Sequence, residues 1–440
     1  MTEEQSATVL TAKQAEEVSA LERWTEPSVW KRRMLTALVT GVKGGCWFSL
    51  IDKVYFYGNL GSAFSKVRDN KGAPGVDRQT IKAYEKHVGK RLWQLSEKIR
   101  KDQYRPKPVR RVQIPKPGTR ETRPLGIPTV EDRIVQTALR NVVEPIYDRE
   151  FAEHSYGFRP GRGCKDALRE VVGLRKAGYT HVVDADLKSY FDTIDHDILM
   201  DLVKRKVSDG RMLKLLRAFL DQKVMEGLKG WIPEKGSPQG AVISPLLSNI
   251  YLDPLDHLME REGFRMVRYA DDFVVLCRSE EEAKRALEVI QQWVSQAKLT
   301  LHPTKTRIVD TRTESFAFLG YEFTPKYRFP RKKSMLKLRD SVRRRTRRNN
   351  GHSLEQIIGD LNPVLRGWFQ YFKQSHRTVF RDVDGWVRMR LRTILRRRRK
   401  KKGRAKGRDH QRWPNAYFAE HGLFSLKQAH DEVVLALSGG

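Results

Sequence analysis

Three aspartates in the sequence have the surroundings expected of a metal site. Asp271 and Asp272 stand side by side in RMVRYADDFVVLC (265–277), between apolar stretches that favour β-strand. Asp186 lies near the end of HVVDADL (181–187), another apolar stretch with strand character. Neighbouring carboxylates that lose water repel each other, and a divalent cation relieves that repulsion. We therefore expect the three carboxylates to meet and to hold Mg²⁺, with Mn²⁺ as a substitute.

Three carboxylates at one place favour phosphoryl transfer by a pair of metal ions. In that chemistry one ion lowers the pKa of an attacking 3′-hydroxyl and the other stabilises the leaving pyrophosphate. Asp184 shares a strand face with Asp186 and is an alternative ligand. An Asp-Asp pair also occurs for purely structural reasons, because aspartate tolerates tight turns. The third carboxylate is what favours the metal site over a simple turn.

The charge of the chain indicates a polyanionic partner. Among 440 residues, 85 Lys and Arg against 53 Asp and Glu give a net charge of +32. Nucleic acid usually balances such a surplus, although a solvated basic surface has the same composition. The three cysteines form no C-x-x-C pair, so neither a zinc module nor a disulfide framework is expected. Without a membrane-length apolar run or a signal-peptide pattern, we expect a cytoplasmic protein with no membrane partner.

The elements that must position the carboxylates alternate between strand and helix. Residues 181–187 favour a buried strand and residues 265–277 favour a β-hairpin. In residues 130–147, apolar side chains recur four positions apart, which predicts a helix with one buried face. After about residue 324 the sequence becomes very basic and helical in pattern. The whole predicts an α+β protein with a helical C-terminal part.

Short motifs across the chain resemble the group II intron reverse transcriptase–maturases and follow that family's order. DLKSYFD and YADD resemble the palm of reverse transcriptases. The matching segments are RRVQIPKPGTRETRPLGIPTVEDRIVQ (110–136), EHSYGFRPGRGCKDAL (153–168), DADLKSYFDTIDH (184–196), KGSPQGAVISPLLSNIYLDPLD (235–256), RYADD (268–272), LTLHPTKTRIV (299–309) and FAFLGYEF (316–323). LRGWFQYF (365–372), RWPNAYF and GLFSL resemble the family's maturase, or X, region and C-terminal end. Many relatives end in an HNH endonuclease module with Cys and His ligands, for which we expect neither the cysteines nor the length in this sequence. If the protein is mobile, we expect it to obtain its DNA primer another way, such as from a nascent strand at a replication fork.

The resemblance implies a right-hand polymerase fold, in which fingers and a palm with an antiparallel sheet precede an α-helical thumb. It divides the chain into an N-terminal helical extension (1–55), fingers and palm (56–323), a thumb/maturase domain (324–400) and a basic tail (401–440). The tail either packs on the thumb or contacts DNA.

The resemblance also implies roles for individual residues. Asp186, Asp271 and Asp272 would bind two catalytic Mg²⁺ ions, and Lys305 would lie near the leaving pyrophosphate as a general acid. The incoming dNTP would be contacted by Lys116, Arg123, Phe191, Gln239 and Gly240. The Phe191 ring would exclude a 2′-hydroxyl, unless it is an ordinary core aromatic.

Basic clusters would bind the nucleic acid backbone. In SYGFRPGRG (155–163), aromatic residues alternate with arginines, which suits stacking and phosphate contacts as well as a loop packed on the fingers. The arginines concerned are Arg159, Arg162, Arg343, Arg344, Arg345, Arg347, Arg348, Arg396, Arg397, Arg398 and Arg399.

The function implied is that of an RNA-directed DNA polymerase that copies its intron RNA and holds that RNA in its self-splicing fold. The implied partners are group II intron RNA, an RNA template with a DNA primer, target DNA and dNTPs. The implied setting is a bacterial-type cytoplasm, at the nucleoid when the protein is on DNA. Two alternatives stay open: a splicing maturase with incidental polymerase activity, and a host-recruited reverse transcriptase without an intron. Whether the protein is a monomer or a homodimer also stays open.

Overall fold

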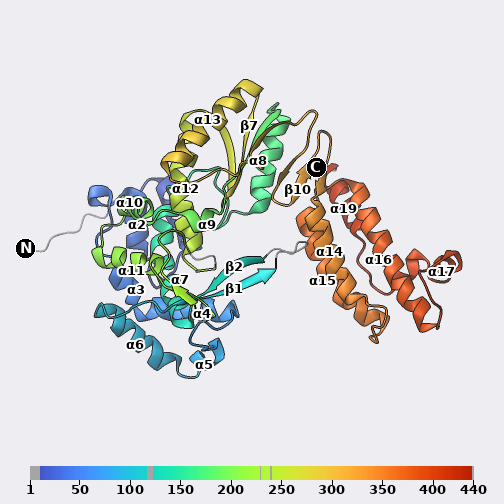
Figure 1. The fold of residues 1–440 in the computed structure, drawn as a ribbon, viewed down its shortest axis with the longest axis horizontal. Helices are drawn as coiled ribbons and strands as arrows, with labels where there is room; N and C mark the ends of the chain where they lie inside the picture. The colour runs from blue at the N-terminus through green and yellow to red at the C-terminus, as the bar shows by residue number, and fades with distance from the viewer. Residues whose placement is uncertain (1–9, 116–121, 228, 238–239, 439–440) are drawn as a thin grey trace, which may run out of the picture. The chain divides into compact units, whose positions relative to one another are not determined.

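The computed structural model describes residues 10–115, 122–227, 229–237 and 240–438, drawn in Figure 1. The chain divides into two compact units. Of the described residues, the first unit contains those within 10–115, 122–179 and 185–308, and the second contains Thr180–Asp184 and 309–438. Helices and separate, largely antiparallel sheets confirm the expected α+β class. Within the described ranges, no helix combines the length and hydropathy that crossing a membrane requires.

Most of the first unit is helical. Its helices are α1 (Ala12–Glu22), α2 (Arg32–Thr40), α3 (Ile51–Tyr55), α4 (Tyr57–Asp69), α5 (Ile81–Glu85), α6 (Val88–Arg100), α7 (Val130–Asp148), α8 (Cys164–Lys176), α9 (Tyr190–Thr193), α10 (His196–Lys204), α11 (Gly210–Leu220), α12 (Ser244–Arg261) and α13 (Glu280–Gln296).

Helix α7 is the helix that the four-residue apolar repeat predicts. The Thr129 hydroxyl caps it by accepting a hydrogen bond from the Asp132 backbone N–H at 3.1 Å. The repeat from Val130 to Ile146 is buried, as predicted, but most other residues of α7 are buried as well. The reason is that α3 and α4 also pack on this helix, so it is a core helix and not an amphipathic surface helix.

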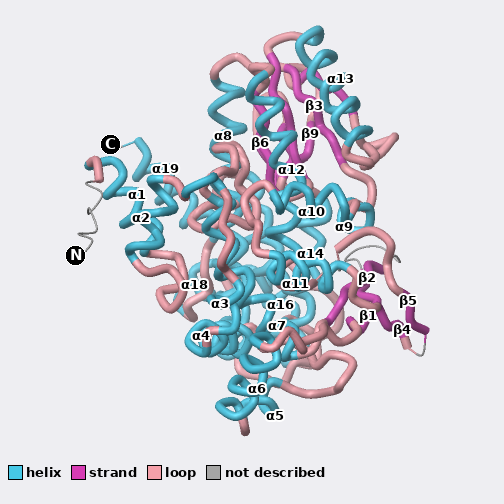
Figure 2. The backbone as a smooth tube through the Cα atoms, turned by 90° about the vertical axis from the view of Figure 1, so that its left-hand side faces the viewer, coloured by secondary structure: helices cyan, strands magenta, loops and turns pink. Residues whose placement is uncertain are grey.

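The first sheet has the strand order β2–β1–β4–β5. Its strands are β1 (Val109–Pro115), β2 (Thr122–Ile127), β4 (Val224–Glu226) and β5 (Lys229–Trp231). In the antiparallel β1–β2 pair, Arg111 lies opposite Gly126 and Ile114 lies opposite Arg123. Because side chains alternate along a strand, Arg111 and Arg123 lie on opposite faces of this sheet. Figure 2 shows the first sheet well apart from β6 of the same unit.

The second sheet has the order β6–β7–β3–β8 and carries the aspartates. Its strands are β3 (His181–Asp186), β6 (Arg265–Tyr269), β7 (Asp272–Cys277) and β8 (Arg307–Asp310). The predicted hairpin is confirmed: β6 and β7 are antiparallel, and Tyr269 pairs with Asp272 across a two-residue turn. The β7 side chains from Phe273 to Cys277 are buried, because α8 and α13 pack on this strand.

The second unit has a small sheet of order β11–β10–β9 and a helical core. Its elements are β9 (Phe316–Phe318), β10 (Tyr321–Phe323), β11 (Arg328–Pro330), α14 (Lys332–Arg345), α15 (Leu354–Phe372), α16 (Arg377–Arg398), α17 (Gly407–Arg412), α18 (Asn415–Glu420) and α19 (Leu426–Ser438). The segment predicted as a tail contributes Trp413, Phe418 and Leu426 to the same buried core as α15 and α16. Asp384 of α16 caps α19 by accepting the Leu426 backbone N–H at 3.0 Å. Packing on the helical domain is therefore the alternative that the structure favours for this segment.

Candidate active site

Asp271 lies in the turn of the β6–β7 hairpin, and Asp272 is the first residue of β7. The turn consists of Ala270 and Asp271, and Ala270 has φ +59°. Residues other than glycine adopt this left-handed region rarely, at a cost on the order of 1–3 kcal/mol. A turn of this kind persists only when its surroundings hold it in place.

A buried arginine on β6 holds the turn. Arg268 is fully buried and forms an ion pair with Asp256 of α12, which is also fully buried. Its Nε lies 2.7 Å from Asp256 Oδ1. Its Nη2 donates to the Ser155 hydroxyl at 2.7 Å, and its Nη1 donates to Asn249 Oδ1 and to the Ala270 carbonyl, both at 3.0 Å. The guanidinium therefore ties the strained residue to α12 and to the segment before α8.

Gly157 packs directly against the same turn. A Cβ atom at Gly157 would lie 2.2 Å from the Ala270 backbone nitrogen and 2.8 Å from the Tyr269 carbonyl carbon. The Gly157 carbonyl accepts a hydrogen bond from Asn249 Nδ2 at 2.8 Å. Only glycine lets the two backbones approach this closely, so this residue determines where the turn sits.

The structure brings Asp186 and Asp271 close enough to interact. Burial raises the pKa of the Asp271 carboxyl, the negative charge of Asp186 raises it further, and the Arg268 guanidinium opposes both effects. Asp186 is the last residue of β3, as the sequence predicted. Asp272 is exposed, and in the described part of the chain no three His, Cys, Asp or Glu side chains form a joint metal-binding group. Two of the three predicted carboxylates thus approach each other, and the role of Asp272 stays a prediction.

Lys305 lies beside the first of these carboxylates. Its Nζ donates to Asp186 Oδ2 at 2.6 Å, and both side chains are partly exposed. The segment that carries Lys305 is fixed next to β3, because the His302 backbone N–H donates to the Asp186 carbonyl at 2.7 Å. Leu187 and Leu301 form an antiparallel bridge just beyond. Lys305 therefore lies next to a predicted metal ligand, and its role as a general acid stays a prediction.

Comparison with known proteins identifies the family. Residues 114–323 match the family model described as reverse transcriptase (RNA-dependent DNA polymerase), and residues 335–413 match the group II intron, maturase-specific domain. The chain is 34% identical over 308 residues to Protein YkfC of Escherichia coli (strain K12), which covers 61% of this chain and 80% of YkfC. The chain belongs to the group II intron reverse transcriptase–maturase family. Residues 114–323 are accordingly an RNA-directed DNA polymerase domain.

Other similarities cover less of the proteins compared. The group II intron-encoded protein LtrA of Lactococcus lactis subsp. cremoris is 37% identical over 196 residues, which is 44% of this chain and 32% of LtrA. The chain thus spans four fifths of YkfC but only about a third of LtrA. A chain of a solved Cas6-RT-Cas1–Cas2 complex has 24% identity and a TM-score of 0.37, over 56% of this chain and 41% of that chain. This last similarity is too low to bear on function.

The described residues fit the divalent metal that reverse transcriptases generally use. Asp186 and Asp271 present oxygen ligands, and their mutual repulsion is what a cation would relieve. Mg²⁺ is commonly held by one or two protein carboxylates together with substrate phosphates. Two adjacent carboxylates in this family's catalytic domain are therefore a suitable donor set.

The structure describes three of the five residues that are predicted to contact the incoming nucleotide. Lys116 and Gln239 lie outside the described residues. Arg123 is exposed on β2. Phe191 is half-buried on α9, and its carbonyl accepts the Ser237 backbone N–H at 2.7 Å. Gly240 has φ +107°, and a Cβ there would lie 2.5 Å from the Gly126 carbonyl oxygen, so this glycine also lets the loop approach β2.

The prediction that Arg159 binds nucleic acid is wrong for this structure. Its side chain is buried, and its Nε lies 2.8 Å from Asp148 Oδ1. Its Nη1 donates to the carbonyls of Ala152 and Ser155 at 2.7 and 3.1 Å. These groups accept the hydrogen bonds of the guanidinium inside the protein. Arg159 therefore holds the loop in which it lies against the segment from Asp148 to Ser155. Sequence alone gave no sign of this, because the acceptors are mainly backbone carbonyls.

The other arginines predicted to bind nucleic acid differ in how far they are exposed. Arg162 is half-buried and pairs with Glu153 at 2.6 Å. Arg343 and Arg396 pair with Asp340 and Asp409, while Arg345 and Arg398 donate to backbone carbonyls. The remaining predicted arginines are exposed: Arg344, Arg347, Arg348, Arg397 and Arg399.

Sequence reasoning missed the residues that brace the hairpin. Arg268, Asp256, Asn249, Ser155 and Gly157 all lie inside quoted family motifs, yet none was assigned a role. The one available signal was that Arg268 follows the apolar pair Met266 and Val267 two positions before the turn.

Proposed function

We propose that this protein copies RNA into DNA at a centre formed by Asp186 and Asp271, and that it binds its own intron RNA through the maturase region. The main support is that the charge of Asp186, at the end of β3, raises the pKa of Asp271, in the β6–β7 turn of the same sheet. The catalytic family match gives the reaction class. Asp272 is included as a third ligand because of its adjacent position.

The proposed chemistry assigns each residue a task. Asp186 and Asp271 hold divalent cations, which when bound supply Lewis-acid activation of the primer 3′-hydroxyl and of the leaving pyrophosphate. Lys305, placed 2.6 Å from Asp186, is the proton donor to the leaving pyrophosphate. Phe191 excludes the 2′-hydroxyl of the incoming nucleotide, and Arg123, with Lys116, Gln239 and Gly240, orients its triphosphate and base.

The maturase region is proposed to bind and position intron RNA. Exposed arginines occur near the ends of α14 and α16, and the chain carries a net charge of +32. Such contacts neutralise phosphates without reading sequence, so they make RNA binding strongly dependent on salt. We propose that the same protein supports splicing, and mobility into target DNA.

Primer extension on an RNA template tests the catalytic centre. Asp271→Ala should abolish cDNA synthesis from a DNA primer, because the cation pair loses one of its two proposed principal carboxylates. Binding of intron RNA and assisted splicing should remain close to wild type, since the maturase region is unchanged.

Asp201→Ala is a matched control, because Asp201 is an exposed aspartate on α10 paired only with Lys204 in a surface ion pair. It should extend primers at the wild-type rate. Undiminished cDNA synthesis by Asp271→Ala, with contaminating polymerase excluded, would defeat the catalytic assignment. Parallel loss of RNA binding would instead show that the variant is misfolded, and a thermal unfolding scan identifies that case.

A further inference from the structure

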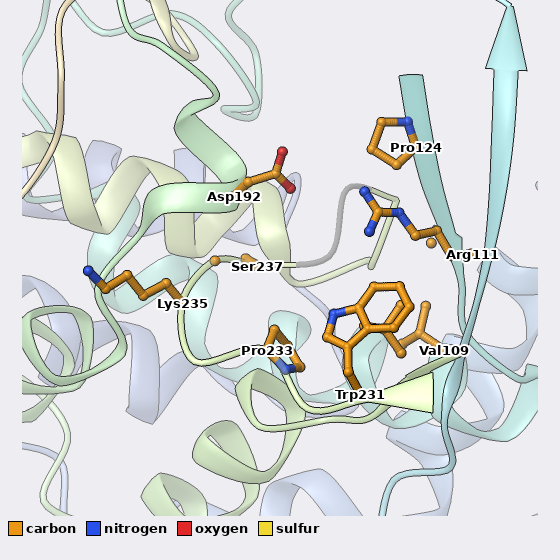
Figure 3. Close-up of a pocket in the computed structure, with 11 residues that line it drawn as sticks. Val109, Arg111, Pro124, Asp192, Trp231, Pro233, Lys235 and Ser237 are labelled. Carbon is orange, nitrogen blue, oxygen red and sulfur yellow. The ribbon is translucent and has the colours of Figure 1, made fainter. Parts of the chain in front are cut away.

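A cavity of about 360 Å³ lies in the first unit, between the first sheet and the loop that follows β5. This volume is within the range of roughly 300–1,000 Å³ typical of small-ligand pockets. The lining residues that carry the argument are shown in Figure 3: Arg111, Pro124, Asp192, Trp231, Pro233 and Ser237. None of them has a role in the catalytic centre proposed above.

One wall of the cavity is an exposed aromatic ring. Trp231 ends β5, and 37% of its surface is accessible. The Arg111 guanidinium lies over this indole, 5.4 Å from the ring centre. Pro124 and Pro233 add apolar surface nearby. An accessible indole beside a cation is the arrangement on which unpaired nucleobases stack, because every base has a flat π-face.

The opposite side of the cavity carries a hydrogen-bond acceptor. In Figure 3 the Asp192 carboxylate and the Arg111 guanidinium both extend toward the space above Trp231. Partial burial raises the pKa of the Asp192 carboxyl, and the charge of Arg111 acts in the opposite direction. A carboxylate repels phosphate and accepts hydrogen bonds from base amino groups. Adenine, cytosine and guanine carry an exocyclic amine, whereas uracil does not.

The cavity adjoins the turn that carries Phe191. A Cβ at Gly236, in the cavity wall, would lie 2.8 Å from the Phe191 carbonyl oxygen. The next residue, Ser237, donates its backbone N–H to the same carbonyl. Because Phe191 is proposed above to contact the incoming nucleotide, the strand being copied would pass close to this wall.

We propose that this cavity takes one unpaired base of the RNA template strand, stacked on Trp231, with preference for a base that carries an exocyclic amine. This inference rests on the proposed polymerase function. An RNA strand fits better than an uncharged ligand, because the chain has a large positive surplus and Arg111 supplies a cation at the cavity itself.

Photocrosslinking locates the bound base without any variant. The full chain is mixed with a DNA primer annealed to an RNA template whose unpaired overhang carries a single 5-iodocytidine, scanned through each position. EDTA is present and dNTPs are omitted, so the result does not depend on catalysis. Irradiation, digestion and mass spectrometry should identify a crosslinked peptide that contains Trp231, for one overhang position.

Matched variants test the stacking partner. Trp231→Phe keeps an aromatic face and should keep the crosslink, whereas Trp231→Ala should lower its yield at least tenfold. Trp231→Ala should also weaken binding of the template–primer about five- to one-hundred-fold, the range that follows from losing one stacked base. Trp93→Ala is the control, because Trp93 is a 61% exposed tryptophan on α6 that does not line the cavity.

The base preference has a separate readout. Replacing cytidine by uridine at the crosslinking position should weaken binding to the wild type, and Asp192→Asn should remove this difference because an amide both donates and accepts. Crosslinks that map only to other aromatic residues, or an undiminished yield with Trp231→Ala, would overturn the proposal. Equal affinity for cytidine and uridine would overturn the base preference. Primer extension by the wild type with Mg²⁺ and dNTPs is run separately, so failure of the polymerase function is distinguished from failure of this pocket.

Discussion

Replacing Arg268 by methionine tests whether a buried ion pair holds the catalytic turn. The side chains of Arg268 and Asp256 are both 0% exposed. Removing one charge of such a pair leaves the other buried without a counter-charge, which costs about 3–5 kcal/mol. Unfolding entropy is about 2.1 cal/mol/K per residue, so in a unit of about 300 residues 1 kcal/mol corresponds to about 1.6 °C in the unfolding midpoint. We therefore expect Arg268→Met to lower the midpoint of the first unit by roughly 5–8 °C.

The assay is thermal unfolding at one fixed scan rate, paired with primer extension. The matched control is Arg265→Met, because Arg265 is an exposed arginine on the same strand, and a surface substitution should stay within about 0.5 kcal/mol. The double variant Arg268→Met/Asp256→Leu leaves no charge uncompensated, so it should recover a large part of the lost stability. Primer extension should be low in Arg268→Met and also in the double variant, because in both the Ala270 carbonyl lacks the hydrogen bond from Arg268.

Three outcomes would refute this reasoning. If Arg268→Met unfolds within about 1 kcal/mol of the wild type, the ion pair does not carry the stability assigned to it. If the double variant recovers stability and also extends primers at the wild-type rate, Arg268 does not position the turn. A double variant less stable than the single one would show that the packing of the arginine, and not its charge, is what matters.

Two further predictions concern other parts of the first unit. Gly157→Ala should cost about 1–3 kcal/mol and sharply reduce primer extension, because the new Cβ meets the Ala270 backbone at 2.2 Å. The control Gly173→Ala, inside α8 with open space around it, should leave primer extension unchanged and raise stability by about 0.5–1 kcal/mol. A loss of stability in both variants would contradict the packing argument. Burial raises the pKa of Asp132 from 3.8 to about 6, so its contribution to stability is present below pH 3.8 and falls by about 3 kcal/mol as the pH rises through 6. Asp132→Asn should remove this loss, because asparagine does not titrate. The test measures the unfolding free energy of variant and wild type at pH 4 and at pH 7, and the wild type should lose more stability than the variant between the two. The same change with pH in both proteins would contradict the prediction.

Local sequence signals predicted the elements that carry the proposed catalytic residues. Short continuous apolar runs beside Asp186 and Asp271 indicated a buried strand and a hairpin, since a strand covered on both faces buries consecutive side chains. The motifs singled out Lys305 as a general acid near the leaving pyrophosphate, but they gave no sign of its 2.6 Å contact with Asp186. The turn itself was less predictable, because Ala270 takes a left-handed conformation that its sequence does not favour.

Long-range pairing accounts for what the sequence did not reveal. Arg268 looks like any arginine of a basic chain until Ser155, 113 positions away, is placed against its guanidinium. The cavity at Trp231 depends in the same way on the parallel pairing of β1 with β4, which brings Val109 beside Val224. Neither pairing has a local signature, because tertiary contacts and not propensities decide it.

The segment SYGFRPGRG (155–163) shows how burial changes the meaning of charge in a chain with so many arginines. Its pattern suits nucleic acid, yet the structure uses it to brace the hairpin. The Tyr156 backbone N–H donates to the Arg268 carbonyl at 2.9 Å, and Gly157 fits against the turn. Arg159 satisfies its guanidinium on Asp148 and on nearby carbonyls, which fixes the loop. Because a buried guanidinium is stable only where oxygens surround it, Arg159 and Arg268 are placed by acceptors that the fold supplies. Substitutions in this segment should therefore disturb catalysis through the position of Asp271, with a smaller effect on RNA affinity than substitutions of the exposed arginines.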